Sequence, residues 1–384
     1  MFPISKSPNS IDTEMSKVVF LPDDLIVEIL SYLPVKPLVR SKSVCKSWNS
    51  LISDSKFGKL RLQRSTRNIH IAVIKHGSGY PNTFVTLPLN HLLENPSITI
   101  SGNSYHRLKF NEPSRIIGSC NGLLCLLDHT TMSTVPKSRF RVWNPTTGII
   151  SEKFGSFNRP LNWSLNCTFG YDNSTGTYKV VVLFRNELQI FSLGDNRRKS
   201  LSFPSSDQSF TFGSSHVNKG VHLSGTINWF AIRHRFNHDF VIISFDLGTE
   251  TFKQFQTPHG VDEVTDVELI IAVLMDCLCF SHNLKNTHFV IWKMTEFGVE
   301  QSWTQFLKIS FQNLLGDEHS WIYHQYFMFP LWLSKNGDTL LLANTKKDQA
   351  ILYNLRDNRE ERTSVDGTAW KKAICYVQSK ASIC

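Results

Sequence analysis

The sequence predicts a short all-α module followed by a large all-β domain, and three observations support this. Apolar residues recur at helical spacing between Leu21 and Leu62, with prolines at the expected helix boundaries. Beyond Ile69, short apolar runs bounded by Gly, Asn and Asp replace that pattern. Aromatic residues make up 12% of the 384 residues and charged residues only 19%, which is typical of a packed β-rich globule.

The first helix is expected to begin at Leu21–Asp24 and to end at Pro34. A proline is tolerated in the first turn, and two carboxylates there favour the positive end of the helix dipole. The apolar residues of this helix fall in two adjacent rows: Leu25, Ile29 and Leu33 in one, Ile26 and Leu30 in the other. This arc is wider than one small core needs, so part of it lacks an obvious partner within the module.

Two more short helices are expected in this segment. Pro37 would open the second helix, and Ser43 would cap the third, which carries Val44, Trp48, Leu51 and Ile52. Helices this short bury little of their own surface, so the surplus apolar residues indicate a permanent partner. A helical subdomain packed on the rest of the chain is the alternative.

The landmarks of this segment resemble the F-box at nearly every position, without a gap. They are Leu21, Pro22, Leu25, Glu28–Leu30, Leu33, Pro34, Leu38, Arg40, Val44–Lys46, Trp48, Leu51, Ile52 and Phe57. The resemblance implies binding to the Skp-type adaptor of cullin-based ubiquitin ligases. Transferred position by position, it implies an adaptor interface made or supported by Leu21, Pro22, Leu25, Ile29, Leu33, Pro34, Leu38, Val44, Cys45 and Trp48. Some of these must form the module's own core, and the sequence does not divide the two sets.

The β domain contains a repeated pair of strands. Five apolar runs carry an aromatic residue before a turn, at Trp143, Phe191, Phe245, Trp292 and Tyr353, with separations of 48, 54, 47 and 61 residues. Each is preceded by another strand-like run, at Gly122–Leu127, Tyr178–Phe184, Gly225–Ile232, Leu274–Phe280 and Gly337–Ala343. One antiparallel sheet per roughly fifty residues is typical of a β-propeller blade, so we expect a six-bladed or irregular kelch-like propeller.

The ends of the β domain are expected to meet. Residues 69–110 would supply further strands, and Ala373–Val377 would close the ring by pairing with them. A two-sheet β-sandwich is the alternative fold, because the copies are weakly alike and lack the double glycine of standard kelch motifs. The expected organisation is a flexible leader at 1–17, the helical module at 18–62 and the β domain at 67–384.

Several stretches of the β domain are similar to the associated domain of plant F-box proteins, the F-box/kelch type that includes the S-locus pollen proteins. They are Ser119–Cys125, Val142–Gly148, Phe169–Asp172, Tyr178–Val181, Gly225–Trp229, Ile243–Asp246 and Tyr376–Val377. The stretch Asn144–Gly148 also predicts a turn on its own chemistry, because Pro presets φ and Gly accepts a positive value. We expect Trp143 and Trp229 to lie in the core.

The charge and the cysteine content limit the classes of partner that we expect for this protein. The net charge is +9, but the only compact basic runs are Arg197–Lys199 and Lys371–Lys372. We interpret them as solvated turns, since neither forms a basic stripe with interleaved aromatics, and we expect no nucleic-acid partner. The eight cysteines have no metal or redox spacing and are expected to be reduced. Without a signal-peptide layout or a membrane-spanning apolar run, we expect no membrane partner and a location in the cytoplasm or nucleus.

Catalytic motifs are missing from the sequence. It shows no nucleophile elbow, no paired carboxylates and no phosphate-binding glycine loop. His234, His238 and Asp239 are interpreted as part of a polar loop rather than as metal ligands. We therefore expect a protein that is not an enzyme and that uses no cofactor or metal.

These observations together predict the substrate-recognition subunit of an SCF-type ubiquitin ligase. The F-box would hold the Skp-type adaptor and through it a cullin, and loops of the β domain would capture a target protein for degradation. Trp321, Tyr323, His324 and Tyr326 form an aromatic-rich run that would either contact the target or cover a blade edge. Two alternatives stay open: an S-locus pollen-type receptor for a ribonuclease, and a propeller that binds glycans or other ligands and carries an F-box.

Overall fold

The computed structural model describes residues 21–33, 35–54, 57, 60, 69–75, 83–98, 106–109, 114–129, 137–158, 166–184, 187–203, 210–212, 219–233, 239–258, 269–285, 287–315, 328–344, 349–365 and 367–379. The chain divides into two compact units, Met1–Arg64 and Ser65–Cys384. The expected leader at 1–17 lies outside the described residues.

In the described part of the N-terminal unit, the three expected helices are present: α1 (Asp23–Tyr32), α2 (Val35–Ser41) and α3 (Lys46–Ser53). Phe57 and Leu60, which follow them, are helical as well. Two boundaries differ from the prediction. The second helix begins at Val35, so Pro37 lies within its first turn, where a missing N–H is tolerated. Ser43 does not cap α3, because its hydroxyl donates to the carbonyl of Arg40 at 2.7 Å, and Cys45 occupies the N-cap position instead.

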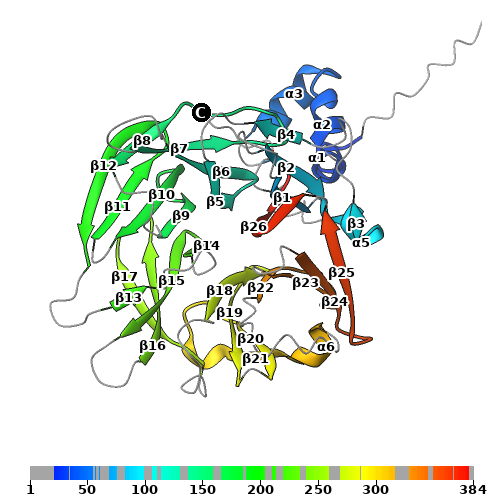
Figure 1. Cartoon of the computed structure of the whole chain (residues 1–384). Helices are drawn as coiled ribbons and strands as arrows, with labels where there is room; N and C mark the ends of the chain where they lie inside the picture. The colour runs from blue at the N-terminus through cyan, green and yellow to red at the C-terminus, as the bar shows by residue number, and fades with distance from the viewer. Residues whose placement is uncertain are drawn as a thin grey trace, which may run out of the picture. The chain divides into compact units, whose positions relative to one another are not determined.

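The second unit consists of six antiparallel sheets arranged around a centre (Figure 1). From the inner to the outer strand, blade 1 is β26 (Thr368–Val377), β1 (Ile69–Lys75), β2 (Thr83–Pro88) and β4 (His106–Lys109). Blade 2 is β5 (Ser114–Cys120), β6 (Leu123–His129), β7 (Lys137–Trp143) and β8 (Phe154–Asn158). Blade 3 is β9 (Asn166–Asp172), β10 (Thr177–Phe184), β11 (Glu187–Ser192) and β12 (Asp195–Ser202).

The other three blades repeat this order. Blade 4 has β14 (Val221–Leu223) and β13 (Phe210–Phe212) on one edge, then β15 (Thr226–Arg233), β16 (Asp239–Asp246) and β17 (Phe252–Gln256). Blade 5 is β18 (Ile270–Leu274), β19 (Cys277–Leu284), β20 (His288–Met294) and β21 (Trp303–Ser310). Blade 6 is β22 (Met328–Leu333), β23 (Thr339–Asn344), β24 (Gln349–Asn354) and β25 (Arg359–Val365), with β3 (Ser97–Ile98) added in parallel at its outer edge.

The inner strands contact one another in a closed cycle, in the order β26, β5, β9, β14, β18, β22 and back to β26. This cycle confirms the propeller and excludes the two-sheet sandwich. The expected closure is confirmed too, because β26 pairs with β1 from Val377 opposite Ile69 to Thr368 opposite Lys75. Propellers leave only short strand edges exposed, which limits edge-to-edge association.

The hydrophobic core lies between adjacent blades. The aromatic residues that mark the sequence repeat all fall on third strands, β7, β11, β16, β20 and β24. Phe191, for example, contacts the rings of Phe140 and Phe157 in the neighbouring blade, at centroid distances of 5.5 and 6.0 Å. Trp143 and Trp229 are fully buried, so their assignment to the core is confirmed.

Blade 1 lacks the signature that marks the other five. Its third strand, β2, ends in Leu87-Pro88 rather than in an aromatic residue. It then continues into a helix, α5 (Leu89–Glu94), instead of a Gly, Asn or Asp turn. Two further short helices, η1 (Glu300–Ser302) and α6 (Phe311–Leu315), flank β21 in blade 5.

Asparagine and aspartate side chains close several turns in the same way. The Oδ1 atom of Asn144 accepts hydrogen bonds from the backbone N–H groups of Thr146 and Thr147, and Gly148 adopts a φ of +77°. This confirms the predicted turn, because a left-handed residue at this point favours glycine. The same capture of the N–H groups two and three residues ahead recurs at Asp172, Asp246 and Asn354.

Candidate functional site

The first helix of the N-terminal unit is built as its sequence predicts. Pro22 occupies the N-cap position, and its carbonyl accepts from the N–H groups of Leu25 and Ile26. Two aspartates stand in the first turn, where negative charge favours the helix dipole. The helix ends at Tyr32, because Leu33 is already extended, as expected for a residue that precedes a proline.

The two apolar rows of α1 have different environments. Leu30 is only 1% exposed, and Ile26 packs against the same cluster. Leu25 and Ile29, in contrast, are 49% and 53% exposed. Leu33 leaves the exposed row and packs on the core, because the backbone departs from the helix at that residue.

The N-terminal unit has a complete small core of its own. Buried side chains from all three helices and the segment that follows form it: Leu30, Leu38, Ile52 and Phe57, with Ile26, Val27, Leu33, Trp48 and Leu51 packed around them. Leu38 is 1% exposed, so it supports the unit from within and cannot face a partner directly. Leu33 and Trp48 are half-buried against this cluster, and Pro34 lies outside the described residues.

What remains outside is an apolar surface along α1 and before α3. We call Leu21, Leu25, Ile29, Tyr32 and Val44 the exposed apolar face. The first four recur at intervals of four, four and three residues, which places them on one side of the helix. Tyr32 is not among the residues predicted for an interface, although its spacing of three from Ile29 places it on that side.

Pro22 and Cys45 are also exposed. The Cys45 sulfur lies 3.1 Å from the hydroxyl of Ser47. This hydrogen bond lowers the pKa of the Cys45 thiol, and a hydrogen bond with the Trp48 backbone lowers it by a smaller amount. Six of the ten residues assigned to an adaptor interface are therefore on the surface: Leu21, Pro22, Leu25, Ile29, Val44 and Cys45.

On the propeller, the residues expected to contact a target lie outside the described residues. These are Trp321, Tyr323, His324 and Tyr326, and the polar loop with His234 and His238 is outside as well. Their assignment stays a prediction. Within the described part of the propeller, two of the turns closed by aspartate side chains instead build a junction between blades 3 and 4.

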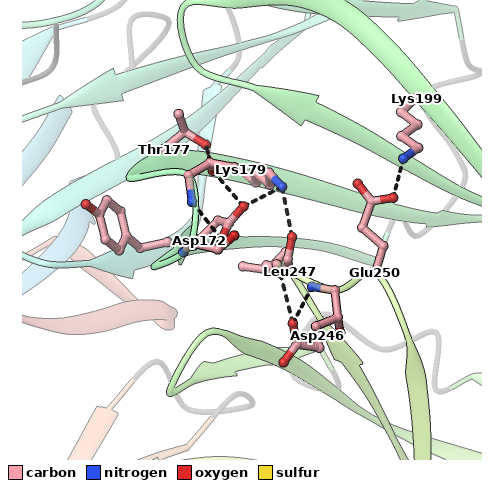
Figure 2. Close-up of polar contacts among 12 residues, drawn as sticks. Asp172, Thr177, Lys179, Lys199, Asp246, Leu247 and Glu250 are labelled. Carbon is pink, nitrogen blue, oxygen red and sulfur yellow. Dashed lines mark hydrogen bonds and ion pairs between the residues drawn. The ribbon is translucent and has the colours of Figure 1, made fainter.

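Figure 2 shows this junction, which connects two hairpin turns through one lysine. The Nζ atom of Lys179 lies 2.7 Å from Oδ2 of Asp172 within blade 3. The same Nζ donates to the carbonyl of Leu247, in the turn after β16 of blade 4, at 2.8 Å. Gly248 permits the close approach, because a Cβ there would stand 2.9 Å from the Ser174 hydroxyl oxygen.

The carboxylate of Asp172 is held in its charged form. Burial by itself would raise its pKa, but hydrogen bonds from Lys179, Thr175 and Ser174 outweigh burial and hold the pKa well below its usual range. Nearby, Asp246 accepts from the N–H groups that follow it, and Lys199 pairs with Glu250 (Figure 2). The junction therefore fixes the two blades relative to each other.

The fold also brings together a cysteine and a histidine that the sequence did not connect. The Cys120 sulfur lies 3.6 Å from Nδ1 of His222. The backbone N–H of Tyr171 donates to the other ring nitrogen, Nε2, at 3.3 Å, so Nδ1 carries the proton of the neutral ring. Burial raises the pKa of Cys120 to about 12 and lowers that of His222, so this pair has no general base to activate the thiol.

Within the part of the chain that the structure describes, no group of three or more His, Cys, Asp or Glu side chains is placed to hold a metal ion. The helices of that part are too short or too polar to cross a bilayer.

Two family models match the chain. The F-box domain matches residues 20–60. The F-box associated beta propeller domain matches residues 82–383, which is most of the chain. The chain belongs to the F-box-associated β-propeller family. As an F-box protein it falls in a class whose members are generally adaptor or receptor subunits.

Curated relatives of this F-box protein come from Arabidopsis thaliana. An F-box/kelch-repeat protein is 29% identical over 359 residues, which cover 88% of this chain and 89% of the relative. The F-box protein CPR1 is 27% identical over 355 residues, covering 85% of this chain and 80% of the relative. Among solved structures, TolB from Acinetobacter baumannii has a TM-score of 0.46 at 11% identity, covering 81% of this chain and 67% of that one, a likeness too low to inform function.

Proposed function

We propose that this F-box protein is the substrate receptor of an SCF-type cullin–RING ubiquitin ligase. The exposed apolar face would bind the Skp-type adaptor, and the propeller would bind a target protein. The observation that carries the proposal is the separation of α1 into a buried row and an exposed row beside a complete core.

The exposed row of α1 offers apolar surface that a partner can bury. Leu25 and Ile29 are each about half exposed, although the unit has already filled its own interior. Burying a large aliphatic side chain fully is worth about 1.5–3 kcal/mol, so covering these residues gives a partner a substantial part of its binding free energy. Apolar residues grouped on one helix side are a usual mark of a helix that docks against another protein.

The propeller supplies the other half of the proposed function. Its closed ring and buried inter-blade cores make a rigid scaffold, and loops on rigid scaffolds are where recognition residues usually lie. The receptor itself would catalyse nothing. It would hold lysines of the target near a ubiquitin-charged enzyme and so raise their effective concentration. No described residue favours a ribonuclease or a glycan over another target.

We also propose that the protein works in the cytoplasm or nucleus. The described cysteines, Cys45, Cys120, Cys125, Cys167, Cys277, Cys279 and Cys375, are free thiols. This state is the usual one in reducing compartments. Imaging of a fluorescent fusion tests the location, and a signal restricted to the secretory pathway would contradict it.

Adaptor binding can be tested by charge substitution on the exposed row. The double variant Leu25→Asp, Ile29→Asp should lose co-purification with a Skp-type adaptor, at least about a hundredfold in affinity, because two carboxylates would enter an apolar interface. Circular dichroism should show an intact unit, since neither side chain is buried. The matched control is Leu93→Asp, which changes an exposed leucine of α5 in the propeller and should bind normally.

Unchanged adaptor binding by the double variant would reject the proposed interface. Substitution of Leu33 or Trp48 would be a poorer test, because both pack against the core and their loss would unfold the unit.

Target capture needs a separate experiment. A proximity-labelling fusion of the whole chain, expressed with the proteasome blocked, should enrich proteins whose ubiquitination depends on the receptor. The Leu25→Asp, Ile29→Asp variant should label the same proteins without promoting their ubiquitination, because its propeller is unchanged. If the labelled proteins are ubiquitinated equally with both versions, the chain is not acting as a receptor for an adaptor-linked ligase.

A further inference from the structure

The outer strand of a blade has a far side on which backbone N–H and C=O groups can pair with another chain. Folded proteins usually keep such edges short, charged or covered, because an open edge promotes association. In the described part of the propeller, five of the six outer strands have at least one of these protections. The exception is β21, the outer strand of blade 5 (Figure 1).

Three of the protected edges are short. The strand β4 has four residues, and β8 and β17 have five each. The end of β17 is also engaged by blade 5. The backbone N–H of Gln256 donates to Oε1 of Glu300 at 2.7 Å, and its carbonyl accepts from Nε1 of Trp303 at 3.1 Å. These contacts leave little of the β17 edge free for another chain.

The other two protected edges carry many charges. The basic run at 197–199 lies on the outer strand β12 and not in a solvated turn, which corrects the interpretation made from the sequence. The second basic run, at 371–372, also lies in a strand, the inner strand β26. Residues 359–362 of β25 are all charged, and β3 already pairs with the end of that strand.

The strand β21 is longer and less charged. It spans eight residues, Trp303–Ser310, and Lys308 is its only charged residue. A bulge at Phe306 interrupts its ladder with β20, but residues 307–310 pair regularly. Within the described residues, β20 is the only strand that pairs with β21. The edge of β21 is therefore open.

The pairing with β20 shows which backbone groups point away from the blade. The N–H of Phe311 donates to the carbonyl of Thr287 at 2.9 Å, which makes this a hydrogen-bonded pair. Such pairs alternate along an antiparallel ladder, so Ile309 and Leu307 direct their N–H and C=O groups at β20. The groups of the residues between them, including those of Lys308, point outward. The edge thus offers a donor and an acceptor at every second residue.

We propose that the outer edge of β21 binds an extended segment of a partner protein, which joins blade 5 as a fifth strand. A peptide backbone supplies alternating N–H and C=O groups at the spacing that this edge requires. The segment would place an apolar residue on the half-buried Leu307 and, next to it, an acidic residue opposite the exposed Lys308. The chain itself offers a precedent, because β3 is an extended segment added to the outer edge of β25.

Charge favours an acidic segment of another protein over a second copy of this chain. Lys308 has no ion-pair partner within the described ranges, so a carboxylate can pair with it. The chain carries a net charge of +9, and two copies therefore repel each other. The inference rests on the proposed function in one respect, because it takes the segment to belong to the target that the receptor captures.

Peptide selection supplies a probe for this edge. Random eight-residue peptides displayed on phage are selected on the full chain, and the enriched sequences are synthesised and titrated by calorimetry. Lys308→Glu should weaken their binding at least about tenfold, because a like charge then faces the acidic residue of the peptide. The matched control is Lys253→Glu, which changes an exposed lysine on the outer strand β17 and should leave the affinity unchanged.

Backbone methylation tests whether the peptide joins the blade as a strand. Methylating every second peptide nitrogen removes N–H groups without changing the side chains. In one frame this should abolish binding, and in the frame shifted by one residue it should leave the affinity nearly unchanged, because only alternate N–H groups face β21. Hydrogen exchange of the full chain should slow in the fragment that contains β21 when the unmodified peptide binds. Equal effects of the two frames would overturn the proposal.

The remaining outcomes are equally clear. If no selected peptide binds, or if Lys308→Glu and Lys253→Glu weaken binding equally, the edge is not a specific site and the proposal is overturned. Dimers that form with rising concentration and slow exchange in β21 would overturn it too, because a second copy would then occupy the edge. Adaptor co-purification is a separate readout, which Lys308→Glu should leave unchanged. Peptide binding without adaptor binding would reject the proposed function and leave the edge site standing.

Discussion

The helical unit and the propeller treat large apolar side chains in opposite ways. Of the nine exposed ones among the described residues, five lie in the helical unit: Leu21, Leu25, Ile29, Tyr32 and Val44. The propeller, several times longer, contributes Leu93 of α5 and three residues from separate connections between strands, Ile149, Met275 and Phe297. Single exposed apolar residues are normal on any surface, whereas a contiguous set indicates an interface. The propeller buries most of its own large apolar side chains, whereas we propose that a partner covers those left exposed on the helical unit.

The largest expected effect is on the stability of the propeller. Phe191→Ala removes a buried ring that joins blades 2 and 3 and should lower the free energy of unfolding by about 3–5 kcal/mol. Urea denaturation followed by tryptophan fluorescence measures this loss. Adaptor affinity should stay the same while the chain is folded, and a parallel loss of both would mean that the two units are not separable in this way.

A smaller loss is expected at the junction of blades 3 and 4. Asp172→Asn leaves the ammonium of Lys179 buried without its carboxylate and should cost about 3 kcal/mol. Adding Lys179→Met should recover part of this, since the stranded charge is then gone. If the double variant is no more stable than Asp172→Asn, the stranded charge of Lys179 is not the cause of the loss. The loss would then come from the turn that Asp172 closes.

The same junction makes stability depend on pH in a defined direction. The pKa of Asp172 is depressed in the folded chain, so the unfolded chain binds the proton more readily. The stabilisation is therefore present above the unfolded value of about 3.9 and is lost as pH falls toward the lower folded value. Wild type should lose stability over this range faster than Asp172→Asn, measured by urea denaturation between about pH 5 and pH 2.5. If the free energies of unfolding of the two proteins fall in parallel over this pH range, Asp172 is not the group responsible for the loss.

The two rows of α1 give a contrast within one helix. Leu30→Ala should destabilise the helical unit by about 2–3 kcal/mol, because it opens a cavity in its core. Leu25→Ala should change stability by less than about 0.5 kcal/mol but weaken adaptor binding by about 1–2 kcal/mol. Thermal melts and adaptor titrations measure both quantities. Equal effects of the two variants on stability would remove the distinction between the rows.

Much of this architecture could be predicted from local patterns. Aromatic residues such as Trp143 and Phe191 mark third strands because each must fill the space between two blades, and the turn at Asn144–Gly148 follows from side-chain capture of backbone N–H groups. Blade 1 lacks these marks, since its third strand runs into α5. The pairing of β26 with β1 that closes this blade was expected from the strand-like runs at the two ends of the domain, but nothing in its third strand marked a blade there.

The candidate sites were less predictable. Helical spacing located both rows of α1, but only the packed core shows that Leu30 is inside and Ile29 outside. Leu33 follows the spacing of the exposed row and still turns inward, because the helix ends before it. The hydrogen bond from Lys179 to the carbonyl of Leu247 joins residues 68 positions apart, so no local pattern could predict it.

Ring closure also sets an order of events during synthesis. The strand β1 pairs with β26, and the side chains of His70 and Gln378, which meet at 3.0 Å, are 308 positions apart. On a ribosome that extends the chain by roughly 5–20 residues each second, blade 1 must wait many seconds for its inner strand. The helical unit lies before the propeller in the chain and is therefore synthesised before this delay. If the helical unit binds an adaptor as we propose, chains shortened before Thr368 are expected to bind it without a closed propeller and to compete with the intact protein.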